Sequence, residues 1–161
     1  MPILKIVTQS PEETRAIGLA LGGSARPGFV YLMSGELGAG KTTLTQGVLE
    51  GLGSDDKARS PTFVLATEYE GRLPLYHIDL YRIDAISELS ELGLDEYFEG
   101  NGLSVVEWAD KAAGHLPAEH LSIHFEHAGE SSRRLRMKST SPEYMAVLDA
   151  VREVAAAQQV A

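Results

Sequence analysis

The chain has 161 residues, of which 43% are apolar, and a net charge of −9. This length favours a single domain over residues 1–161 with a real hydrophobic core, and no run of about 20 apolar residues is present to span a membrane. Cysteine is absent, which excludes disulfides and thiolate metal sites. The first ten residues hold one lysine and no long apolar segment, so we expect no signal peptide and a cytoplasmic location.

The first part of the chain predicts alternating strands and helices. Ser10 can cap the first helix, Pro11 suits its first turn, and Glu13 completes a capping box. In chain order, we expect a strand at 3–7, a helix from Ser10 to Gly23, a strand at 29–33, a glycine-rich loop, a helix from Lys41 to Gly53, and a strand at 62–70 that turns at 70–72.

The rest of the chain predicts more strands than helices. The expected elements are the return strand of that hairpin, a partly helical segment at 86–98 with a break near Gly93, strands at 103–108, 120–127 and 133–138, and a helix at about 142–157 with a frayed tail. This order predicts the α/β class: a three-layer domain like those of P-loop NTPases, with a mixed parallel and antiparallel sheet.

The segment GELGAGKTT (35–43) matches G-x-x-x-x-G-K-[ST] and lies between an apolar strand and an amphipathic helix, the context that a phosphate loop requires. Its glycines let successive N–H groups point at phosphates, and the helix N-terminus adds partial positive charge. Lys41 should reach the β- and γ-phosphates, and the Thr42 hydroxyl should ligate Mg²⁺. The expected nucleotide contacts in this segment are Glu36, Leu37, Gly38, Ala39, Gly40, Lys41, Thr42 and Thr43.

A P-loop enzyme also needs a carboxylate near its metal. Asp79 follows the apolar segment LPLYHI, and Glu107 follows LSVV. Both stand where a strand ends, which is where α/β sheets bind ligands. The spacing leaves open which of the two holds the metal directly and which acts through water.

Other residues allow two interpretations each. Ser60 and Thr62 stand where P-loop proteins carry a switch segment, or in a simple turn. His77 is either a packed histidine or a base. Trp108 belongs to the core or contacts a partner, and Arg82 either stabilises transferring charge or pairs with an acid.

The basic residues near the C-terminal end form one cluster. Strand alternation would place Arg134, Arg136 and Lys138 on one face. This face is either solvated or in contact with a nucleotide or a partner. The net charge repels phosphate backbones, so we expect no direct tight binding of nucleic acid.

Five motifs, GELGAGKTT, SPTF, HIDLYR, ELGLDEYF and VEWADK, stand in an order and spacing that resemble the TsaE family, also called YjeE. The resemblance covers about residues 10 to 138. One departure is SPTF, where many relatives have SPTY.

The resemblance implies a bacterial P-loop ATPase that binds ATP and ADP with Mg²⁺. The family is needed to form threonylcarbamoyladenosine at position 37 of tRNAs that read ANN codons, and it acts on the proteins TsaB and TsaD. It implies that Lys41 and Thr42 hold the phosphates and Mg²⁺, that Glu107 is a metal ligand, and that Asp79 is essential to activity. Lys41, Asp79 and Glu107 are thus the expected catalytic residues.

Further contacts follow from the same resemblance. Ser60 and Thr62 match the switch region of the family, and Trp108 lies beside its site. The start of the first helix and a late strand approach the nucleotide, and there we expect Pro11 and Arg134. Hydrolysis by the isolated chain should be slow, because no arginine finger or water-positioning glutamine is visible in the sequence.

Three other functions would also use a bound nucleotide. A GTPase needs an Asn-Lys-x-Asp motif, but the only asparagine, Asn101, is followed by glycine. A small-molecule kinase needs an acceptor pocket and a lid, and no insertion supplies one. A nucleotide-gated adaptor with incidental turnover remains an alternative to an ATPase.

Overall fold

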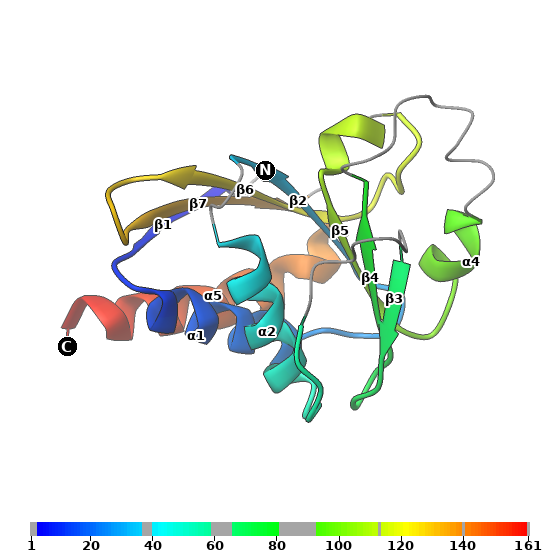
Figure 1. The fold of residues 1–161 in the computed structure, drawn as a ribbon, viewed down its shortest axis with the longest axis horizontal. Coiled ribbons are helices and arrows are strands. Elements are labelled where there is room, and N and C mark those ends of the chain that lie inside the picture. The colour runs from blue at the N-terminus through cyan, green and yellow to red at the C-terminus, as the bar shows by residue number, and fades with distance from the viewer. Residues whose placement is uncertain are drawn as a thin grey trace.

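We analysed a computed structural model, which describes residues 3–36, 40–58, 66–80, 93–112, 114–139 and 141–160. Its centre is a seven-stranded sheet in the order β1-β7-β6-β2-β5-β4-β3 (Figure 1). In chain order the elements are β1 (Ile3–Thr8), α1 (Pro11–Gly23), β2 (Val30–Gly35), α2 (Lys41–Gly51), β3 (Ala66–Tyr69), β4 (Leu75–Asp79), α4 (Leu94–Phe98), β5 (Leu103–Glu107), η1 (Ala109–Ala112), β6 (Leu121–His127), β7 (Arg133–Ser139), η2 (Pro142–Tyr144) and α5 (Met145–Val160).

The sheet is parallel at its centre and antiparallel at both edges. Strand β2 pairs in parallel with β5 and β6, and β5 pairs in parallel with β4. Strand β3 is antiparallel to β4, and β7 is antiparallel to both β6 and β1. The predicted α/β class with a mixed sheet is confirmed. Because β2, β5 and β4 run in the same direction, their carboxyl ends lie side by side at the same end of the strands.

Helices cover the two faces of the sheet unequally. Helices α1, α2 and α5 lie along one face (Figure 1), and the larger core cluster there includes Ile17, Leu44, Phe125 and Leu148. On the other face, a smaller cluster that includes Leu94 of α4 packs on β2, β5 and β4. Among the described elements, no helix covers this second face over β6, β7 and β1 (Figure 1).

Helices α1 and α2 pack backbone against backbone. A Cβ atom at Gly18 would lie 2.2 Å from the carbonyl oxygen of Leu44, and one at Gly47 would lie 2.1 Å from that of Arg15. Residues four apart share a helix face, so each helix presents two glycines to the other. The four glycines of this contact are Gly18, Gly22, Gly47 and Gly51.

We expect Gly18→Ala to lower the free energy of unfolding by about 2 kcal/mol, because its methyl group meets rigid backbone and the helices must separate. Urea denaturation with an unchanged m-value measures this loss. Gly23→Ala is the matched control, since a Cβ there would lie 3.9 Å from its nearest neighbour outside α1, the Gly51 carbonyl oxygen. Equal losses in both variants would contradict the close helix contact.

The start of α1 follows the prediction with one difference. The Ser10 side chain accepts a hydrogen bond from the Glu13 amide, and Pro11 occupies the first turn. The Glu13 carboxylate accepts from the Gln9 amide at 2.9 Å, one residue earlier than in a capping box.

The last helix extends beyond its predicted end. After the η2 turn, α5 continues to Val160, whereas the sequence predicted an end near 157. The Gln158 side chain donates a hydrogen bond to the Glu13 carbonyl at 2.9 Å, which ties the final turns to α1.

Other boundaries differ by a few residues. Strand β2 ends at Gly35, two residues later than predicted, and β5 ends at Glu107, one residue earlier. The predicted break at Gly93 is the start of α4, where this glycine has φ 64°. Residues 62–65 and 86–92 lie outside the described residues. In the part of the chain that the structure describes, no helix has the length and hydropathy to cross a membrane.

Candidate nucleotide-binding site

The glycine-rich motif joins the strand and helix that the sequence predicted for it. Strand β2 ends at Gly35, and α2 begins at Lys41. Gly40 precedes the helix with φ 98°, a left-handed conformation that favours glycine. The predicted contacts Leu37, Gly38 and Ala39 lie outside the described residues.

Lys41 directs its side chain back toward the sheet. Its Nζ donates a hydrogen bond to the Gly35 carbonyl at 3.3 Å and lies 3.9 Å from the centroid of the Trp108 ring, within cation–π distance. The residue is only 6% exposed. Burial lowers the pKa of Lys41, and the nearby carboxylates of Glu107, Asp110 and Asp79 oppose that shift.

Two carboxylates at the ends of adjacent strands lie near Lys41. Asp79 and Glu107 are register partners on the parallel strands β4 and β5, so their side chains leave the sheet side by side. Glu107 is also the partner of Met33 near the end of β2. The sheet order therefore places both predicted acids at the carboxyl end of the parallel strands, next to the point where β2 ends and the glycine-rich motif begins.

His77 is a buried hydrogen-bond partner of Glu107. Its Nε2 lies 2.5 Å from Glu107 Oε2, and the His77 side chain has no exposed surface. No described residue contacts His77 Nδ1 by a hydrogen bond. A fully buried ring cannot reach a bound molecule, so the geometry favours the packed histidine of the two interpretations, with the added effect of orienting the Glu107 carboxylate.

Trp108 follows β5 directly and has an unusual backbone conformation. It is the one non-glycine residue with positive φ (59°) in the part of the chain that the structure describes. Such backbone costs free energy and tends to persist at functional sites. The turn follows Glu107 directly and brings the indole ring against the Lys41 ammonium.

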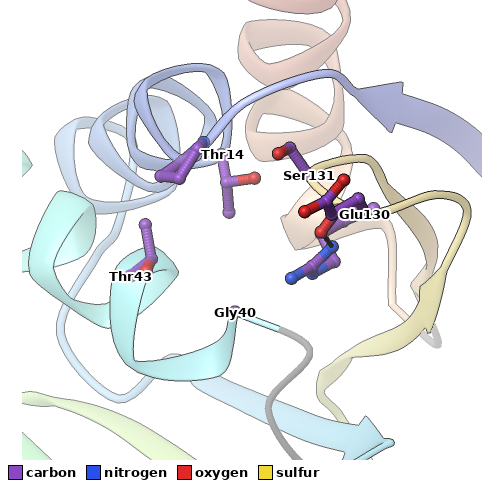
Figure 2. A pocket seen from close by; sticks show the side chains of 7 residues that line it. Thr14, Gly40, Thr43, Glu130 and Ser131 are labelled. Atoms are coloured by element: carbon purple, nitrogen blue, oxygen red, sulfur yellow. Dashed lines mark hydrogen bonds between the residues drawn. The ribbon is translucent and has the colours of Figure 1, made fainter.

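A pocket of about 190 Å³ lies beside the start of α2 (Figure 2). Three segments far apart in the sequence surround it: the first turns of α1 and of α2, and the turn between β6 and β7. In Figure 2, Thr14 on α1 and Thr43 on α2 stand on one side, and Glu130 and Ser131 of the turn stand opposite. The lining residues are Pro11, Thr14, Gly40, Thr43, Glu130, Ser131 and Arg133.

The arginine at this pocket is Arg133 and not Arg134. Arg133 lines the pocket, and its guanidinium donates to the Ser132 carbonyl at 2.9 Å. Arg134 is exposed, and its Nη1 lies 3.3 Å from Glu126 Oε2. Neighbouring side chains on a strand point to opposite faces, so the two arginines cannot share this pocket. Pro11, the other residue expected near the nucleotide, does line it.

The other predicted residues are placed as follows. Thr42 is exposed in the first turn of α2. Glu36 follows β2, and its carboxylate lies 3.6 Å from His127 Nε2. Ser60, Thr62 and Arg82 lie outside the described residues.

Sequence reasoning missed five residues near the site. These are Thr14, Glu130, Ser131 and Arg133 at the pocket and Asp110 near Lys41. No motif marks these pocket residues. Asp110 lies in the VEWADK motif, three residues after Glu107 and on the η1 turn, and this was the available signal.

Comparisons with known proteins agree with this geometry. The family described as "Threonylcarbamoyl adenosine biosynthesis protein TsaE" matches residues 8–135. The tRNA threonylcarbamoyladenosine biosynthesis protein TsaE of Bacillus subtilis is 46% identical over 145 residues, covering 89% of this chain and 90% of that protein. The protein of the same name from a Nostoc species is 40% identical over 135 residues, which cover 81% of this chain and 82% of that protein.

A solved structure shares the fold. The crystal structure of YdiB from Bacillus subtilis superposes with a TM-score of 0.79 at 40% sequence identity, covering 94% of this chain and 95% of that one. The match of the family to residues 8–135 extends over most of the chain and includes the phosphate loop and both carboxylates. The chain therefore belongs to the TsaE family of tRNA threonylcarbamoyladenosine biosynthesis.

Proposed function

We propose that this chain binds ATP and ADP with Mg²⁺ and hydrolyses ATP. One observation carries the proposal: Lys41 stands at the N-terminus of α2, buried beside carboxylates from two adjacent parallel strands. A cation and helix N-terminus suit phosphates, and carboxylates at the same edge suit a metal and a water molecule.

The nucleotide lies along the N-terminus of α2. The phosphates bind in the glycine-rich loop and to Lys41. The Lys41 ammonium then donates its hydrogen bond to phosphate oxygens in place of the Gly35 carbonyl. The adenosine end occupies the pocket between α1 and the β6–β7 turn. At about 190 Å³, this pocket is smaller than the roughly 300–1,000 Å³ of drug-sized sites, so it suits one part of a nucleotide.

The residues present fit Mg²⁺. Thr42 and Glu107 would hold it, and their hydroxyl and carboxylate oxygens are the hard ligands this ion takes together with phosphate oxygens. When bound, Mg²⁺ neutralises negative charge on the β- and γ-phosphates. His77 keeps the Glu107 carboxylate in one orientation through the 2.5 Å contact, and Asp79, beside it in register, orients the attacking water.

Membership of the TsaE family supports the following biological role. The chain acts on the TsaD and TsaB proteins, in the cytoplasm, during formation of threonylcarbamoyladenosine at position 37 of tRNAs that read ANN codons. ATP hydrolysis resets that assembly between rounds, and turnover by the isolated chain is slow. The alternative is an adaptor in which nucleotide binding alone supports the assembly.

Reconstitution tests this role. Purified TsaD, TsaB and the other pathway components, with tRNA and ATP, should give several rounds of modification per assembly when this chain is present. Without it, modification should stop after about one round. Equal yields with and without the chain would reject the reset role while leaving nucleotide binding, measured separately by calorimetry, in place.

A further inference from the structure

The open face of the antiparallel half of the sheet carries a cluster of cations. We name this surface the basic face and define it by Ile3, Lys5 and Val7 of β1 and Arg134, Arg136 and Lys138 of β7. The register pairs these six residues across the two strands: Ile3 with Lys138, Lys5 with Arg136, and Val7 with Arg134. All six side chains are exposed. They therefore form one continuous surface on the sheet face that no described helix covers.

Three of the four cations of this face have no carboxylate partner among the described residues. Lys5, Arg136 and Lys138 form no ion pair with any described residue, and Arg134 alone meets a carboxylate, that of Glu126. Lys5 and Arg136 stand directly opposite one another, an arrangement of like charges that destabilises a sheet. The chain as a whole has a net charge of −9. A concentration of unpaired cations on such a protein is explained by a negatively charged partner.

Apolar side chains within the face indicate what that partner is. Ile3 and Val7 are 52% and 42% exposed, two of the three exposed large hydrophobic residues in the part of the chain that is described. They flank Lys5 on the same strand. A phosphate backbone gains nothing from covering them, whereas protein interfaces combine apolar contacts with arginine.

The dimensions fit an extended segment of polypeptide. Alternate residues on a strand lie about 7 Å apart, so the three basic positions of β7 span about 14 Å. An extended acidic segment presents its own alternate side chains at the same interval. This face also contains a pocket of about 230 Å³, which could accept a side chain of such a segment. The pocket is lined by Lys5, His124, Glu126, Arg134 and Arg136.

We propose that the basic face is a docking surface for an acidic, partly apolar segment of a protein partner. The face is separate from the nucleotide site, because Arg133 of the pocket and Arg134 of the basic face point to opposite sides of β7. The proposal therefore does not depend on nucleotide binding or hydrolysis.

The test uses two fluorescent peptides with amidated C-termini, (Glu-Val)6 and (Glu-Gly)6, and a fluorescent seven-nucleotide oligouridylate, whose six phosphodiesters match the six glutamates in charge. Fluorescence anisotropy at fixed salt should show (Glu-Val)6 binding tightest. The variant Lys5→Glu/Arg136→Glu should weaken it at least tenfold. The matched control, Lys57→Glu/Arg152→Glu, changes the net charge equally at exposed positions elsewhere and should weaken it less than threefold.

A second variant addresses the apolar contribution. Ile3→Ser/Val7→Ser should abolish the preference for (Glu-Val)6 over (Glu-Gly)6. Calorimetry with ATP and thermal unfolding should be unchanged in every variant, which shows that the fold and the nucleotide site are intact. RNA binding as tightly as the peptides, equal losses in the two charge-reversed variants, no preference for valine, or no peptide binding would each overturn the proposal.

Discussion

Lys41→Ala is expected to weaken binding of ATP and ADP about 100-fold, or about 2.7 kcal/mol. The reason is that the Lys41 ammonium lies buried at the N-terminus of α2, where a charge-assisted bond to phosphate is strong. Calorimetry with nucleotide and Mg²⁺ measures the loss. Trp108, the one tryptophan of the chain, contacts this ammonium, so its fluorescence gives a second measurement.

Two further variants make this result specific. Lys57→Ala removes an exposed lysine and should leave affinity within about twofold, because surface charges contribute little. Lys41→Arg should recover only part of the affinity, since a planar guanidinium does not replace a compact ammonium. Wild-type affinity in Lys41→Ala, with an intact fold by circular dichroism, would remove the basis for the proposed phosphate site.

Glu107→Gln is expected to reduce ATP hydrolysis by at least about 100-fold, because the loss of a residue that only supports a metal ligand already costs about 10- to 100-fold, and Glu107 is proposed to bind the metal itself. Nucleotide affinity should change less than about threefold, because Lys41 and the helix N-terminus still hold the phosphates. The amide keeps the size of the carboxylate and can still hydrogen bond to His77. Single-turnover hydrolysis and calorimetry on the same preparation separate the two effects.

Glu68→Gln is the control, since this carboxylate is exposed on β3, and it should hydrolyse ATP at the rate of the unmodified chain. Unchanged hydrolysis in Glu107→Gln would show that Glu107 is not a metal ligand. A Glu107→Gln protein that binds ATP without hydrolysing it, yet supports full multiple-turnover modification of tRNA, would favour the adaptor over the ATPase.

The sequence alone predicted the parts of the site that depend on local patterns. The phosphate motif is contiguous, so its strand and helix could be placed from Gly35 and Lys41. Asp79 and Glu107 each follow a short apolar run, and a parallel sheet brings such strand ends together. These features need no knowledge of which distant segments meet.

The remaining parts depend on distant contacts and on strand register. The pocket needs the β6–β7 turn to reach the start of α1, more than 110 residues away, and no local pattern encodes that approach. The choice between Arg133 and Arg134 depends on which face of β7 meets the helices, and a shift of one residue reverses it. The contact of His77 with Glu107 likewise needs the pairing of β4 with β5.

The glycine contact between α1 and α2 also bears on the proposed nucleotide site. Because the two backbones touch, we expect the helices to move together, so that the N-terminus of α2 travels with the part of α1 that carries Thr14. In the proposed nucleotide site, the spacing between the phosphates and the base would then be constant on that side. Among the described residues that line the pocket, those opposite α1 and α2 belong to the β6–β7 turn and the start of β7, so we expect adjustment to a different base, or closure around a bound one, to occur at Glu130 and Ser131.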